Sequence, residues 1–384
     1  GLASASALFL AASGLSIIFG VTRVVNFAHG SFYMLGAYFG YSLVHQLGGG
    51  AVGFWVALLI AALAVGVVGL LVEVIILRRL YHAPELFQLI ATFGVILIVQ
   101  DAVFWAWGAE NLLGPRVLAG LWLLFNRTRW GILVRAATED REMVGALGVN
   151  QSLLFTGVFV LGSALAGLGG AVQLPKGDAN LLMDFGILAE VFVVTVVGGM
   201  GSILGAFLAA VLISELNTFG ILVWPNGTLV LMFILMAVIL IIRPTGLLGR
   251  PETETGATQV VLPAGPHYKI FVAVVLAALA LAPLVVDDFL LVLVTDILVL
   301  ALFATSLHFL MSTGGLVSFG HAAFYGGGAY AAALMVTYAA TPFELALLLA
   351  PFGAGLLALI IGWFCVRLSG VYFAMLTLAF AQGG

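Results

Sequence analysis

Charged residues are scarce in this chain. Only 8% of its 384 residues are Asp, Glu, Lys or Arg, whereas a soluble globular protein has about 25%. The chain is instead 63% hydrophobic, with a mean hydropathy of +1.24. Too few polar groups remain to cover a surface in water. The composition therefore predicts an all-α polytopic membrane protein that lies in a lipid bilayer.

Several chemical signatures are also missing. Cys365 is the single cysteine, so no disulfide within the chain is possible. The sequence has no GxxxxGK[ST] loop for ATP and no HExxH, GxSxG or CxxC motif. No basic patch suggests a nucleic-acid partner, and no second histidine or carboxylate lies at metal-ligand spacing from His29 or His321. We therefore expect neither an enzyme nor a cofactor or metal in this chain.

Long apolar runs take the place of these signatures. Residues 270–286, 289–311 and 345–366 meet or approach the roughly 20 residues that cross a bilayer core. Residues 2–20 are predicted to be a first membrane helix, because no basic segment precedes them as in a cleavable signal peptide. Small residues recur every four positions at Gly162, Ala166 and Gly170, which favours close helix packing.

One motif occurs twice, 292 residues apart. NFAHGSFYMLGAY at 26–38 returns as SFGHAAFYGGGAY at 318–330, with seven of thirteen positions identical. Such a repeat predicts two related, pseudo-symmetric membrane halves, an arrangement with which many transporters build their pathway. The glycines in both copies permit broken or re-entrant helices where the backbone lines a cavity.

Polar residues within the two copies are the candidates for a translocation pathway. Such groups are costly at membrane depth, and they usually face a cavity or a partner. An alternative is that the histidines brace neighbouring helices by hydrogen bonds, and repetition does not separate the two interpretations. The candidates are Asn26, His29 and Ser31 in the first copy, and Ser318 and His321 in the second.

Cations and prolines indicate the organisation of the chain. Arginines gather near 78–79, 127–141, 243–250 and 367, which predicts that these regions are cytoplasmic. The segments near 46–52, 108–116, 176–184 and 220–227 would then face outward. Residues 244–268 contain four prolines and no long apolar run, so they are predicted to be a cytoplasmic linker between a first half, 1–243, and a second half, 269–384.

The most charged stretch is residues 126–151. A polar cluster there is followed by apolar residues, which suits either a short amphipathic helix that docks into a soluble partner or an ordinary solvated loop. The candidate docking residues are Arg135, Glu139, Asp140, Arg141, Glu142 and Gly148.

Several motifs resemble a known family. Residues 14–38, 129–150, 196–210 and 243–251 resemble the H-type permease subunit of branched-chain amino acid ABC transporters. The motifs GGLVSFGHAAFYGGGAYAAALM and RLSGVYFAMLTLAFAQ, at 314–335 and 367–382, resemble the M-type subunit. The resemblance implies an H-type subunit fused to part of an M-type subunit. The second half is shorter than an M-type subunit, and only about ten apolar residues separate Pro115 from Asn126, so we expect missing segments at both places.

The resemblance also implies a function and partners. The family imports small amino acids through the bacterial inner membrane. A periplasmic binding protein delivers the substrate, and two cytoplasmic ATPase subunits bind ATP and Mg and drive transport. The coupling helix of the family falls on residues 135–150, which favours docking there. Transport of urea, amides or small carboxylates is the alternative within the family. A secondary carrier coupled through scattered carboxylates, or a scaffold that moves no solute, are alternatives outside it.

Overall fold

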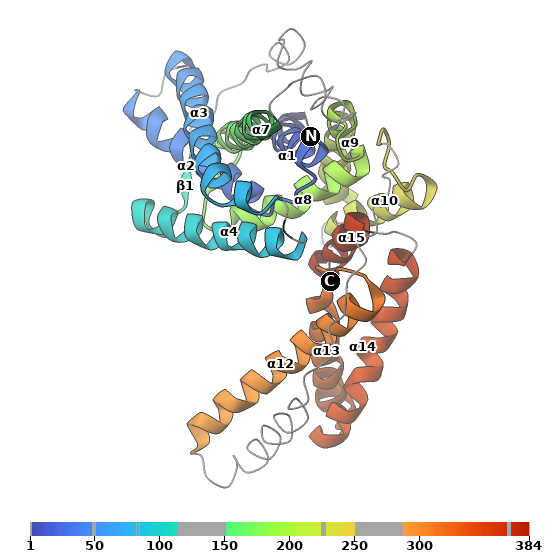
Figure 1. Ribbon diagram of the computed structural model, residues 1–384. Coiled ribbons are helices and arrows are strands. Elements are labelled where there is room, and N and C mark those ends of the chain that lie inside the picture. Colours follow the sequence, from blue (N-terminus) through green and yellow to red (C-terminus); the bar gives the residue numbers. More distant parts are fainter. Residues whose placement is uncertain are drawn as a thin grey trace. The chain divides into compact units, whose positions relative to one another are not determined.

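The computed structural model describes residues 2–47, 51–81, 83, 85–113, 151–223, 228–249, 287–366 and 370–383. The chain forms two compact units (Figure 1). The first unit contains Gly1–Arg250 together with Ile360–Gly384, and the second contains Pro251–Leu359.

Seven described helices are long and apolar enough to cross a membrane, which confirms the predicted all-α polytopic fold. The predicted first span is α1 (Leu2–Thr22), and the runs at 289–311 and 345–366 are α12 (Asp288–Gly314) and α14 (Phe343–Cys365). The predicted run at 270–286 lies outside the described residues. The spans are Ser4–Thr22, Val52–Arg79, Phe87–Trp107, Ser152–Gln173, Ile203–Leu222, Leu290–Met311 and Phe343–Cys365.

Two helices lie at the centre of the first unit, α1 and α7 (Gln151–Gln173). Both are in contact with several neighbours: α7 packs on α2 (His29–Gln46) and α3 (Ala51–Ile75), and α1 packs on α9 (Ile203–Val223). Figure 1 shows α2 and α3 on one flank of the α1–α7 pair and α9 on the other. Because it is surrounded in this way, α1 is buried almost throughout, although it is the first helix of the chain.

Shorter and peripheral elements complete the first unit. α8 (Met183–Gly198) packs against α1, α2 and α9, and α4 (Glu85–Trp107) packs against α2. α10 (Thr228–Ile242) and α15 (Gly370–Gly383) contact α8. The 3₁₀ turn η1 (Leu77–Arg79) follows α3. The two-residue strands β1 (Leu112–Leu113) and β2 (Asp178–Ala179) pair antiparallel, with Leu112 opposite Ala179.

Glycine allows α2 and α7 to cross in direct backbone contact. A methyl group placed on Gly36 would collide with the carbonyl of Gly167, and one placed on Gly170 would collide with the carbonyl of Tyr33. Such small-residue contacts replace the hydrophobic driving force, which is weak between helices in lipid. The predicted close packing at Gly170 is therefore confirmed, and its partner is the helix that contains the first motif copy.

Large apolar side chains cover the outer helices of the first unit. Leu63 on α3, Ile98 on α4 and Leu204 on α9 are more than 60% exposed. Exposed apolar surface on this scale marks a membrane or interaction face rather than a surface in water. The exposure pattern agrees with the apolar composition of the chain.

The second unit contains α12, α13 (His321–Ala339) and most of α14. Asp287 caps α12, and its Oδ1 accepts a hydrogen bond of 3.1 Å from the amide of Leu290. α13 begins at His321, just as α2 begins at His29, so the two motif copies open equivalent helices.

Proline ends the helix α10 as predicted. α10 stops at Ile242, two residues before Pro244, which cannot continue a helix. Most of the predicted linker lies among residues 250–286, outside the described part of the chain. The boundaries 1–243 and 269–384 stay predictions.

Candidate functional site

The first motif copy begins at a break between two buried helices. α1 ends at Thr22, and α2 begins at His29 after six non-helical residues. Asn26 is fully buried in this break. Its Oδ1 accepts a hydrogen bond of 3.1 Å from the amide of Ala28, and its carbonyl accepts one of 3.3 Å from the amide of His29. Asn26 therefore forms the turn that starts α2.

Both motif histidines contact the helix that precedes them. Nε2 of the fully buried His29 donates to the carbonyl of Ala11 in α1 at 2.7 Å. Nε2 of His321 lies 2.7 Å from the hydroxyl of Ser306 in α12. In each ring Nδ1 has no hydrogen-bond partner within the described part of the chain. The shared geometry is that of a helix brace, repeated in both units.

Ser31 connects the motif to a buried carboxylate by a hydrogen bond. Its hydroxyl donates to Oδ2 of Asp184 in α8 at 3.2 Å. Gln100 of α4 donates to both oxygens of Asp184, at 3.2 and 3.1 Å. Asp184 is only 2% exposed, and none of these partners carries a positive charge. This hydrogen-bonded group connects α2, α4 and α8 at one point.

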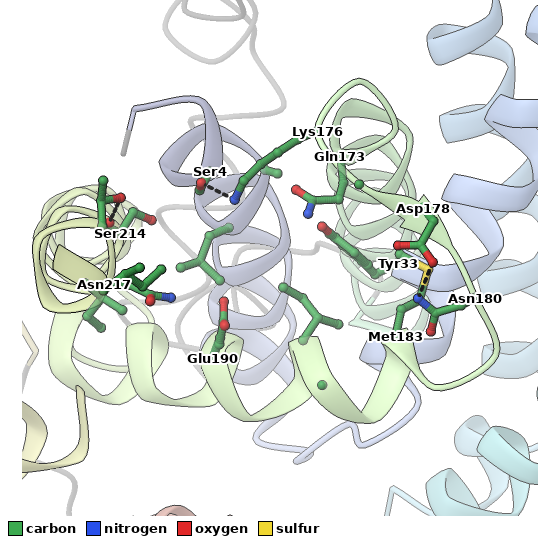
Figure 2. Close-up of a pocket in the computed structure, with 18 residues that line it drawn as sticks. Ser4, Tyr33, Gln173, Lys176, Asp178, Asn180, Met183, Glu190, Ser214 and Asn217 are labelled. Carbon is green, nitrogen blue, oxygen red and sulfur yellow. Dashed lines mark hydrogen bonds between the residues drawn. The ribbon is translucent and has the colours of Figure 1, made fainter. Parts of the chain in front are cut away.

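A cavity of about 600 Å³ lies on the other face of α8. Met183, Gly186, Ile187 and Glu190 of α8 follow one another at helical spacing and line it, whereas Asp184 points to α2 and α4. Figure 2 shows Lys176 and Glu190 approaching the same space, the first from the connection after α7 and the second from α8. The other lining residues are Ser4, Ala7, Leu8, Tyr33, Gln173, Gly177, Asp178, Asn180, Ile213, Ser214, Asn217, Thr218 and Ile221.

The lining combines apolar walls with a few polar groups. Such a cavity, within the usual size range of ligand sites, is the general form of a small-molecule binding site. Lys176 donates to the hydroxyl of Ser4, and Asn180 donates to Asp178 at 3.4 Å. Ser214 has a buried hydroxyl oxygen without a hydrogen-bond partner among the described residues. The cavity is therefore the candidate binding site of the first unit.

The predicted pathway residues are not among those that line this cavity. Asn26, His29 and Ser31 are buried at the α1–α2 break and at the α2–α8 contact. Tyr33, two residues after Ser31, is the member of the motif that lines the cavity. Ser318 and His321 belong to the second unit, where Ser318 is 4% exposed. Their common role in a pathway stays a prediction.

Sequence reasoning missed most of the cavity. In the sequence, Lys176 is only one cation in a segment predicted to face outward, and Glu190 is only a single carboxylate in an apolar run. The signal that was available is their chemistry: both are ionisable groups inside or beside membrane helices, where charge is costly. The predicted coupling residues Arg135, Glu139, Asp140, Arg141, Glu142 and Gly148 lie outside the described residues.

The chain matches the profile of one known protein family. The profile of the family described as "Branched-chain amino acid transport system / permease component" matches residues 1–112, 86–242 and 289–383. The matches lie on both sides of the predicted linker, so both halves are related to this family. The assignment of the second half to the M-type subunit stays a prediction.

Curated relatives match two thirds of the chain. The high-affinity branched-chain amino acid transport system permease protein BraD of Pseudomonas aeruginosa is 30% identical over 293 residues, which cover 66% of this chain and 95% of BraD. The corresponding LivH protein of Escherichia coli is 28% identical over 296 residues, with the same coverage. A probable LivH of Methanocaldococcus jannaschii is 25% identical over 284 residues, 63% of this chain and 88% of that protein. No solved structure matches the chain.

These relatives are named as permease proteins and not as enzymes, which agrees with the expectation from the missing catalytic motifs. The family profile covers most of the chain, and seven of the described helices suit a bilayer. The chain is a multi-pass membrane protein and belongs to the permease family of branched-chain amino acid transport systems.

Proposed function

We propose that this chain is the transmembrane permease of an ATP-driven, binding-protein-dependent importer of branched-chain amino acids. The observation that carries the proposal is the family match on both sides of the linker, together with relatives that are named for this transport. The membrane is the bacterial inner, or plasma, membrane.

ATP hydrolysis belongs to partner subunits in this proposal. The sequence has no nucleotide-binding loop of the GxxxxGK[ST] type, so two cytoplasmic ATPase subunits would bind ATP and Mg. Arg135, Glu139, Asp140, Arg141, Glu142 and Gly148 would form the helix that docks with one of them. A periplasmic binding protein would deliver the amino acid from the other side.

The cavity supports an entry site on the outer side. Lys176 lies in a segment predicted to face outward, and the cavity extends from there to Glu190 on α8. Beside Tyr33, which lines the cavity, α2 and α7 are in backbone contact, Gly36 with Gly167 and Tyr33 with Gly170, so these two helices leave no space between them there. A solute that reaches the cavity would therefore need a rearrangement of helices to continue, as alternating access requires.

Reconstituted vesicles test the proposal. The full chain, combined with its ATPase subunits and binding protein, is expected to accumulate labelled leucine, isoleucine or valine only when ATP is present on the ATPase side. A panel with urea, amides and short carboxylates separates the substrates of related systems. Uptake driven by a proton gradient without any ATPase would contradict the proposal and favour a secondary carrier. Partner binding without movement of any solute would favour a scaffold.

A further inference from the structure

The cavity of the first unit contains separated charges of opposite sign. Lys176 lies at its exposed side, and Glu190 is half-buried on α8. In the described part of the chain these two side chains form no direct ion pair, and Glu190 has no hydrogen-bond partner there. An unpaired carboxylate among apolar helices is costly unless a ligand or water contacts it.

The other charged side chain of the cavity already has a partner. Asp178 lies in β2 and accepts a hydrogen bond from Asn180. Lys176 donates to the neutral hydroxyl of Ser4, and it acts on Glu190 only through space, without a direct ion pair. The cavity therefore offers one cation and one anion at different places on its wall, each available to a group of opposite charge.

Apolar side chains line the same cavity as these two charges. Leu8 on α1, Ile187 on α8 and Ile213 on α9 line the cavity. Leu8 and Ile213 are almost fully buried, at 3% and 1% exposure. A ligand that matches this wall has a carboxylate, an ammonium group and an aliphatic side chain.

We propose that this cavity is a binding site for the zwitterion of a free aliphatic α-amino acid, in which Lys176 binds the α-carboxylate and Glu190 binds the α-ammonium group. Charge-assisted hydrogen bonds of this kind are stronger than neutral ones. Urea and simple amides lack both charges, and a simple carboxylate would leave Glu190 unpaired, so the site selects against them. This proposal rests on the proposed function and adds the groups that recognise the substrate.

Ligand analogues that lack one charge test each contact separately. The full chain, purified with its ATPase subunits in detergent, is titrated with labelled leucine in competition with leucine amide, which keeps the ammonium group, or 4-methylpentanoate, which keeps the carboxylate. Glu190→Gln is expected to weaken leucine and leucine amide binding by about tenfold or more but to leave 4-methylpentanoate binding unchanged or tighter, because the anion that disfavours this ligand is removed. Lys176→Met is expected to weaken leucine and 4-methylpentanoate but not leucine amide.

A matched control and a separate uptake assay make the result decisive. Glu215→Gln changes the same chemical group on α9 outside the cavity and is expected to bind all three ligands like the unaltered protein. The proposal is overturned if the unaltered protein binds no leucine, or if each variant affects the three ligands equally. Leucine uptake by the unaltered protein together with unchanged binding by both variants would refute this site alone. Leucine binding without ATP-dependent uptake would refute the proposed transport function alone.

Discussion

The buried residues of the first motif copy have distinct structural tasks. Asn26 forms the turn before α2, His29 contacts α1, and Ser31 contacts Asp184 on α8. These three residues thus stabilise the start of α2 and connect it to α1 and α8. Tyr33 is the residue of this motif that lines the cavity.

Replacement of His29 distinguishes a helix brace from a pathway residue. His29→Ala removes the hydrogen bond to Ala11 and leaves space in a fully buried position, so we expect the free energy of unfolding to fall by about 1–3 kcal/mol. Thermal unfolding of the purified protein measures this. His29→Gln retains an N–H donor and is expected to recover part of the loss.

The control for this prediction is His45→Ala, at an exposed position near the end of the same helix, which should change stability little. A variant at position 29 with normal thermal unfolding but reduced leucine uptake would contradict the brace and support direct contact with the substrate.

Asp184 shows what the sequence could and could not predict at this scale. The sequence predicts that the polar group of Ser31 faces a cavity or a partner. The partner is 153 positions later in the chain, and no local pattern identifies it. The same limit applies to the position of Lys176 and Glu190 in one cavity. It depends on the orientation of α8, which directs Asp184 toward α2 and α4 and Glu190 toward the cavity.

Helix packing is the scale at which the sequence was most informative. Long apolar runs predicted α1, α12 and α14, and Pro244 predicted the end of α10, because span length and proline geometry are local properties. The four-residue spacing of small residues also predicted a close contact at Gly170. Its partner, the carbonyl of Tyr33, could not be predicted, since spacing marks a face but not the helix that covers it.

A methyl group at this contact is expected to force α2 and α7 apart. In Gly170→Ala the new side chain collides with the backbone carbonyl of Tyr33, which cannot rotate away. We expect a loss of about 2 kcal/mol or more in the free energy of unfolding, as for other overpacked sites. Because Tyr33 lines the cavity, leucine binding should weaken too.

Gly94→Ala is the matched control within α4. No atom lies within 4 Å of the added methyl group there, and alanine favours a helix more than glycine does, so stability should be unchanged or slightly higher. Equal stability of the two variants in thermal unfolding would show that α2 and α7 do not depend on backbone contact.

At the scale of the whole molecule, the repeat relates the two units. α2 and α13 both begin at the motif histidine, and each histidine contacts the helix before it. The hydroxyl of Ser31 has no counterpart in the second copy, because residue 323, which corresponds to Ser31, is alanine. The repeated element is therefore the helix pair with its brace, whereas the polar contact to α8 belongs to the first unit.

Charge reversal in the segment 135–150 tests how the molecule couples to ATP. Replacement of both Glu139 and Asp140 by Lys reverses the sign of the polar cluster, so we expect weaker binding of the ATPase subunits and loss of ATP-dependent leucine uptake. Co-purification of the ATPase with the full chain measures the first effect. Glu110→Lys reverses an exposed carboxylate in a segment predicted to face outward and serves as the control. If the double variant retained the ATPase as well as this control does, residues 135–150 would be a solvated loop, and the docking helix would have to be sought elsewhere in the chain.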